Sequence, residues 1–135
     1  MTITFLDMED SANESNGMKF QSSGELIQIL EKSRNRPHFL CKLTSDKGHY
    51  LDVGVGKVGC AQHTRVGGMP PYLMAVAPGK EHVNEEDGGY TEFLCGGTPT
   101  PVSDRFCMPF ETVREIVRHF SETGETHPEF SWDPA

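Results

Sequence analysis

Residues 50–79, YLDVGVGKVGCAQHTRVGGMPPYLMAVAPG, decide what kind of sheet this chain builds. Gly54, Gly56 and Gly59 have the G-x-G-x-x-G spacing of a dinucleotide-binding turn, in which a strand ends and a helix begins. The residues after Gly59 lack the apolar periodicity of a helix, and Pro70-Pro71 would stand inside it, where a proline costs about 3 kcal/mol. The stretch therefore predicts antiparallel strands joined by a glycine turn near residues 56–59, and it argues against a phosphate-binding loop.

Further strands are predicted on both sides of this stretch. Phe39, Cys41 and Leu43 alternate with polar residues, and a turn at 45–48 leads back into a strand at 50–55. Strands are also expected over residues 58–64, 72–77 and 90–97, which gives about five antiparallel strands in a single sheet. Residues 98–106, TPTPVSDRF, are predicted to be irregular or an edge, because two prolines cannot lie in a central strand.

Two helices are expected to flank these strands. Residues 23–34 follow Ser22, which forms a capping box with Glu25 and precedes an apolar stripe. The second helix starts near Pro109, and Gly124 is its expected end. Its apolar residues fall on one face: Phe110, Val113, Ile116, Val117 and Phe120.

The predicted architecture is therefore an α+β fold, with an N-terminal and a C-terminal helix on one face of a single antiparallel sheet. The whole chain, residues 1–135, is expected to be one domain. Residues 1–18 are expected to add a strand and a polar loop, and Trp132 to anchor the C-terminal tail over the core.

The charge distribution favours some partners and disfavours others. The net charge is −8, and residues 81–135 carry twelve acids against three bases. Nucleic-acid binding needs clustered Lys and Arg, so direct binding of nucleic acid is not expected. An acidic surface suits a basic protein partner, although acidic surfaces also serve solubility alone. No apolar run is long enough for a membrane helix and no secretory signal is visible, so we expect a cytoplasmic protein.

A search for catalytic patterns gives no constellation that holds. The sequence contains no G-x-S-x-G, no H-E-x-x-H and no Walker A loop. Cys60 and His63 could share a metal ion, but no second pair at ligand spacing supports them, so no metal and no cofactor are expected. We predict no catalytic residues. The alternative left open is a small cytosolic enzyme that uses Cys60, His63 or His82.

The stretch KEHVNEEDGGY, residues 80–90, is the most unusual one in the second half of the chain. It reads either as a solvated loop or as a protein-binding surface, in which carboxylates form charge pairs beside an aromatic anchor. The binding interpretation assigns partner contacts to Glu81, Glu85, Glu86, Asp87 and Tyr90. Such a surface would fit a basic cleft that normally holds nucleic acid.

The order of several segments resembles the immunity-protein one family of bacterial polymorphic-toxin systems. These segments are LDVGVG (51–56), TEFLCGG (91–97), MPFETVREIVRHFSETGE (108–125) and PEFSW (128–132). The resemblance covers roughly residues 20–133, and its most specific parts are Gly96-Gly97, Thr123-Gly124-Glu125 and Trp132.

This resemblance implies a function. Members are immunity proteins that bind and neutralise a cognate toxin, and they are often paired with nucleic-acid deaminase toxins. We therefore expect a non-enzymatic inhibitor of a cytidine-deaminase-like toxin domain that occludes its substrate cleft. The resemblance implies no catalytic residues for this chain. The assignment of partner contacts to the acidic loop, residues 80–90, is an inference from the residues alone. An acidic adaptor for another basic protein is a further alternative, and the oligomeric state is left open.

Overall fold

The computed structural model of this protein describes residues 1–134, which contain two α-helices and ten strands. The helices are α1 (Ser23–Ser33) and α2 (Phe110–Thr123). The strands are β1 (Ile3–Asp7), β2 (Lys19–Phe20), β3 (Phe39–Ser45), β4 (Tyr50–Val55), β5 (Val58–Thr64), β6 (Tyr72–Ala75), β7 (Tyr90–Cys95), β8 (Thr98–Ser103), β9 (Met108–Pro109) and β10 (Trp132–Pro134). Two 3-10 turns, η1 (Val66–Gly68) and η2 (Asp104–Phe106), lie in the connections. The α+β class is confirmed.

The prediction of about five strands is wrong, because the structure has ten. β2, β9 and β10 have only two or three residues each, which is too short for an alternating pattern to be visible. β8 carries Pro99 and Pro101 and pairs only with β7, so the expected edge position of this segment is confirmed. β1 is the additional N-terminal strand that the sequence predicts.

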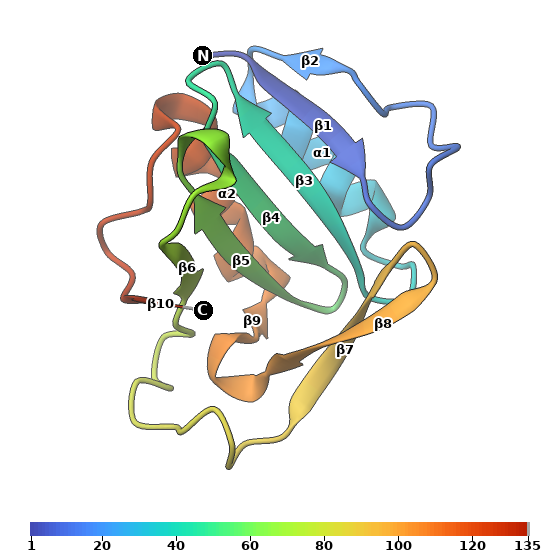
Figure 1. The fold of residues 1–135 in the computed structure, drawn as a ribbon. Coiled ribbons are helices and arrows are strands. Elements are labelled where there is room, and N and C mark those ends of the chain that lie inside the picture. The colour runs from blue at the N-terminus through green and yellow to red at the C-terminus, as the bar shows by residue number, and fades with distance from the viewer. Residues whose placement is uncertain (135) are drawn as a thin grey trace.

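The main path of the sheet runs in the order β10-β6-β5-β4-β3-β1-β2, and neighbours along it are antiparallel. β7 and β8 form an antiparallel hairpin, which joins the first residue of β3 through one parallel bridge between Phe39 and Leu94. β9 pairs with β5. Figure 1 shows the hairpin leaving the main sheet beyond β3. The sheet is thus antiparallel apart from this single bridge.

Both helices cover the same face of the sheet, as predicted, and lie behind it in Figure 1. α1 ends one residue before its predicted end, and the Ser22 side chain makes no capping hydrogen bond. α2 ends at Gly124 as predicted. This residue has a left-handed φ of 74°, and its N–H donates to the Phe120 carbonyl at 2.7 Å. The core between helices and sheet includes Phe5, Phe39, Leu43, Val53, Phe110, Val117 and Phe120.

Side chains along β5 and β6 point alternately to the two faces of the sheet, and this alternation creates a second apolar cluster on the face away from the helices. Ala61 and Ala75 face the helices, whereas Cys60 and Met74 face the β7–β8 hairpin with Phe93. The second cluster consists of Cys60, Met74, Val76, Phe93, Phe106 and Cys107. The hairpin is therefore fixed over the face that the helices leave uncovered.

The glycines of GVGKVG have a packing role, which confirms their assignment to the scaffold of the sheet. A Cβ atom at Gly54 would lie 2.6 Å from both the Cys60 sulfur and a Phe93 ring carbon, and one at Gly59 would meet the Gly54 carbonyl. A side chain at either position would collide with strand neighbours. The spacing that resembles a nucleotide-binding turn thus reflects the close contact of β4 and β5.

The C-terminal tail returns to the sheet, as predicted from its single tryptophan. Trp132 pairs with Ala75, packs against the main core, and donates from Nε1 to the His127 carbonyl at 3.0 Å. Among residues 1–134, neither helix is long and apolar enough to cross a membrane.

Candidate functional site

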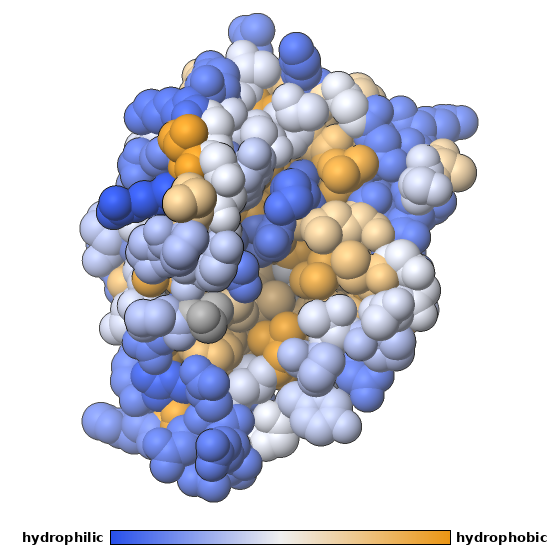
Figure 2. Space-filling view, in the orientation of Figure 1, coloured by the Kyte–Doolittle hydropathy of each residue, from blue (hydrophilic) through white to orange (hydrophobic). Residues whose placement is uncertain are grey.

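The face opposite the helices has a hollow between the main sheet and the β7–β8 hairpin. Figure 2 shows hydrophobic side chains in this hollow and hydrophilic ones around it. The hollow has a volume of about 290 Å³, and its lining includes Met74, Val102 and Phe106. A second hollow of about 480 Å³ lies against the same hairpin and shares Glu85 with the first. The two hollows share Glu85, Pro101 and Ser103, but the apolar side chains of Met74, Val102 and Phe106 line only the first one.

Three of the five residues predicted to contact a partner line the second hollow. They are Glu85, Glu86 and Tyr90. Glu81 and Asp87 lie in the same loop and are exposed, but they do not line it. The Tyr90 side chain is 65% exposed, which is unusual for a large aromatic residue. The structure therefore places part of the predicted surface in a shaped site.

Sequence reasoning missed Glu92, Pro99 and Pro101, which also line the second hollow. Glu92 lies in β7 between the exposed Tyr90 and the buried Phe93, so its exposure follows from its place in the hairpin. It stands opposite Pro101 in β8. The signal that could have found it is strand alternation, continued beyond the acidic loop into β7.

The carboxylates of this surface have no cationic partner within residues 1–134. Glu81, Glu85, Glu86, Asp87 and Glu92 take part in none of the ion pairs there. Asp87 accepts one hydrogen bond, from Nδ2 of Asn84 at 3.0 Å. Uncompensated like charges on one surface produce a local negative potential. The surface therefore favours a positively charged partner.

The backbone of the acidic loop is held from inside by two cations. Nη1 of Arg105 donates to the carbonyls of Lys80, Glu81 and Val83 at 3.2, 2.7 and 2.7 Å. Nζ of Lys80 donates to the backbone carbonyls of Asp104 and Cys107 at 3.1 and 3.0 Å, and to Oδ1 of Asp104 at 3.0 Å. These bonds fix the main chain and leave the glutamates unused. The loop is thus preorganised, which reduces the entropy lost on binding.

The alternative enzyme site is not assembled. Cys60 and His63 are three residues apart on β5 and project to opposite faces, since Cys60 lies in the hairpin cluster and His63 packs against Phe120. His82 lies in the exposed acidic loop. Burial raises the pKa of the Cys41 and Cys60 thiols far above its ordinary value, which disfavours the reactive thiolate. The structure therefore does not bring Cys60, His63 and His82 together in one site.

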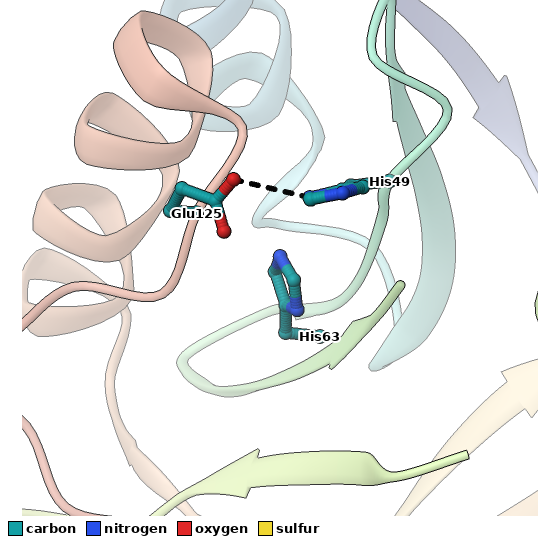
Figure 3. A group of neighbouring side chains, drawn as sticks. All are labelled: His49, His63 and Glu125. Atoms are coloured by element: carbon teal, nitrogen blue, oxygen red, sulfur yellow. Dashed lines mark ion pairs between the residues drawn. The ribbon is translucent and has the colours of Figure 1, made fainter. Parts of the chain in front are cut away.

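A different group of titratable side chains meets at the end of α2. His49 lies just before β4, His63 lies in β5, and Glu125 follows the C-terminal Gly124 of α2. Figure 3 shows the two imidazole rings and the carboxylate converging on one point. Nδ1 of His49 is 3.4 Å from Oε2 of Glu125. Sequence reasoning considered His63 with Cys60 and missed this group, because its members are far apart in the chain.

The surface around the β7–β8 hairpin combines unpaired carboxylates and the exposed Tyr90 with a neighbouring apolar hollow. These are features of a protein-binding surface, since protein interfaces join an apolar centre to a polar rim. Comparison with known families agrees with this class. The model of the family described as "Immunity protein Imm1" matches residues 16–134, and the chain belongs to this family. This result confirms the resemblance seen in the sequence. No curated protein matches the chain.

Proposed function

We propose that this protein binds and neutralises a cognate bacterial toxin with nucleic-acid deaminase activity, most simply a cytidine deaminase, by occluding its substrate cleft. Membership of the immunity family supports the toxin partner. The observation that carries the choice of surface is the set of uncompensated carboxylates, three of which (Glu85, Glu86 and Glu92) line the second hollow beside the exposed Tyr90. The protein acts in the cytoplasm of the producing cell, without catalysis of its own.

The charge of the surface explains how a deaminase cleft would be recognised. An enzyme that acts on nucleic acid holds phosphates with Lys and Arg. Carboxylates at Glu85 and Glu86 can replace phosphate oxygens in such a cleft, and Arg binds carboxylate with two parallel hydrogen bonds. The preorganised loop would present these groups without first having to order. Opposite charges also accelerate the encounter of the two proteins.

Tyr90 supplies the apolar part of the contact. The residue is 65% exposed and lines the second hollow together with Pro99 and Pro101. Tyrosine is enriched among residues that carry most of the binding free energy, because it buries a large rigid area with few rotatable bonds. Tyr90 would therefore anchor the contact, while the carboxylates set its orientation.

The experiment is a titration of the purified toxin domain encoded beside this protein, with deamination of a cytidine-containing oligonucleotide as the readout. We expect stoichiometric inhibition by the wild type. The triple variant Glu85→Ala, Glu86→Ala, Asp87→Ala should bind the toxin about 10- to 100-fold more weakly, mostly through faster dissociation, with slower association at low salt as a smaller part. The matched control Glu14→Ala, Glu25→Ala, Glu122→Ala removes the same charge at exposed positions elsewhere and should bind like the wild type.

The outcomes separate the parts of the proposal. Equal losses in both triple variants would show that net charge, not this surface, determines binding. A complex that still deaminates the oligonucleotide would contradict occlusion of the cleft. A cognate toxin with another activity would contradict the deaminase assignment while leaving immunity in place. If the neighbouring toxin does not bind and a different basic protein does, the acidic adaptor is the better function.

A further inference from the structure

We propose that His49, His63 and Glu125 form a metal site that binds a divalent transition metal ion, with Zn²⁺ as the best fit. The ligand atoms of these side chains lie within 4.8 Å of one another (Figure 3). They come from three segments, the turn before β4, strand β5 and the end of α2. The site lies on the helix-covered face, away from the acidic loop, and the inference does not depend on the proposed function.

The distances within the group suit tetrahedral coordination. With metal–ligand bonds of about 2.1 Å, the ligand atoms of a tetrahedral zinc site are about 3.4 Å apart. Nδ1 of His49 and Oε2 of Glu125 are 3.4 Å apart. The Gly124 carbonyl oxygen lies 2.9 Å from Nδ1 of His49 and 3.0 Å from Nε2 of His63. These two contacts are hydrogen bonds, which a bound ion would replace, and a water molecule would take the fourth position beside two nitrogens and the carboxylate oxygen.

The electrostatics of this corner favour a cation. The carbonyl groups at the C-terminal end of α2 carry the negative end of the helix dipole, and the Glu125 carboxylate adds a full negative charge. Two imidazoles direct ring nitrogens at the same Gly124 carbonyl. A metal ion bound there would replace these two hydrogen bonds: each ring nitrogen would lose its proton, by tautomerisation or by release to solvent, and act as a lone-pair donor.

The two histidines differ in exposure in a way that suits a ligand pair. His63 is 2% exposed and packs edge-on against Phe120 and Trp132, which fixes its ring. Burial disfavours the charged imidazolium and so favours the neutral ring, which is the form that ligates metals. The Glu125 side chain is 50% exposed, which leaves the site open to solvent on one side.

The ligand types select the class of metal. Imidazole nitrogen suits Zn²⁺ and its transition-metal neighbours, whereas Ca²⁺ and Mg²⁺ prefer sites built from oxygen alone. The bound ion would join the turn before β4 to β5 and to the end of α2, next to the start of the C-terminal tail. We therefore infer a structural role, in which the ion stabilises the folded chain.

The test uses the full chain, stripped of metal with a chelator and then titrated with Zn²⁺ alone. Thermal unfolding should shift upward by about 5–10 °C at a 100-fold excess over the dissociation constant. Mg²⁺ should have no comparable effect. Co²⁺ should give the visible absorption of a tetrahedral site, without the thiolate band that cysteine ligation would add.

Variants locate the ion. Glu125→Gln removes a half-exposed ligand, and its fold can be checked by circular dichroism. We expect its Zn²⁺ affinity to fall on the order of 100-fold, because changes to even the outer partners of a ligand cost about 10–100-fold. His49→Ala should have a similar effect and serves as a second test. Glu122→Gln and His82→Ala change exposed residues outside the group and should retain wild-type affinity.

The proposal would be overturned by any of three results. One is the absence of Zn²⁺ binding to the stripped protein at micromolar concentrations. Another is binding that Glu125→Gln and His49→Ala leave unchanged. The third is a thiolate band with Co²⁺, which would place the ion on cysteine. None of these results bears on toxin binding, so the two proposals fail separately.

Discussion

Asp7 and the acidic loop at residues 80–90 show two opposite uses of carboxylates in one molecule. Asp7 is 2% exposed and fully occupied: Arg36 donates to it at 2.7 Å, Asn13 at 3.0 Å, and the N–H groups of Glu9 and Asp10 at 2.9 Å each. In the acidic loop the main chain is held by hydrogen bonds while Glu85 and Glu86 have no ion pair within residues 1–134.

The difference indicates which acids are structural and which are available to a partner. A buried carboxylate that is saturated with donors contributes to folding and can contact nothing else. A carboxylate on a loop whose main chain is fixed by other groups contributes little to folding and stays free for binding. The comparison therefore predicts that stability and toxin affinity respond to different residues.

The largest expected effect is on stability, from Arg36→Met. The change leaves the buried Asp7 carboxylate without its cation and removes the stacking of the guanidinium over Phe39, whose ring centre is 3.7 Å away. We expect a loss of about 2–3 kcal/mol in the free energy of unfolding, measured by urea denaturation, since breaking a buried pair costs about 3–5 kcal/mol and Arg36 is partly exposed.

The control for this prediction is Arg118→Met, which breaks an exposed pair with Glu115 and should change stability by less than about 0.5 kcal/mol. Toxin affinity should stay unchanged in both variants. Equal losses of stability in the two variants would remove the distinction between occupied and free carboxylates on which the comparison depends.

The sequence predicts the elements that have strong local patterns. The apolar stripe of α2 and Gly124 define that helix, and the alternation at 39–43 defines the β3–β4 hairpin. The sequence cannot predict the attachment of the β7–β8 hairpin, because it joins the main sheet through one bridge at Leu94 and through side-chain packing against distant strands. Long-range pairings of this kind depend on packing between distant segments, and no local pattern encodes them.

The same limit applies to the sites. The cluster of acids at 85–87 is visible in the sequence because its members are adjacent. The roles of Arg105 and Lys80 in fixing that loop are not visible, since their acceptors are backbone carbonyls up to 27 residues away. His49, His63 and Glu125 meet only because β4, β5 and α2 are packed together. Sequence reasoning finds groups of residues that are adjacent in the chain, whereas groups of distant residues come together only when the chain folds.

A smaller effect is expected on toxin affinity, from Tyr90→Ala. The ring is exposed in the free protein, so its removal should leave the free energy of unfolding nearly unchanged. Affinity should fall by about 30-fold, the equivalent of about 2 kcal/mol for an aromatic anchor. Tyr90→Phe should retain most of the affinity. Tyr72→Ala, at the exposed first residue of β6, is the matched control, and a similar loss there would place the contact elsewhere.

The smallest effect, and the finest test of the comparison, is the dependence of stability on pH. Burial alone would raise the pKa of Asp7, but hydrogen bonds from Arg36, Asn13 and two backbone N–H groups outweigh it, and the pKa lies below its ordinary value of 3.8. The unfolded chain therefore binds a proton first, so the stabilisation is present above about pH 4 and is lost as the pH falls toward the folded pKa. His63 gives the same sign at higher pH: its pKa is lowered from 6.5 by burial, so stability should already decrease as the pH falls below that value.

Urea denaturation from pH 7.5 to 3, with a chelator present, should show both decreases. Asp7→Asn should be less stable than the wild type at pH 7 but should lose less between pH 5 and 3. The triple variant Glu85→Ala, Glu86→Ala, Asp87→Ala should keep the acid-side slope of the wild type, because those carboxylates hold nothing in the fold together. If the triple variant flattened the slope as much as Asp7→Asn, the loop acids would be structural, and the case for reserving them for a partner would be lost.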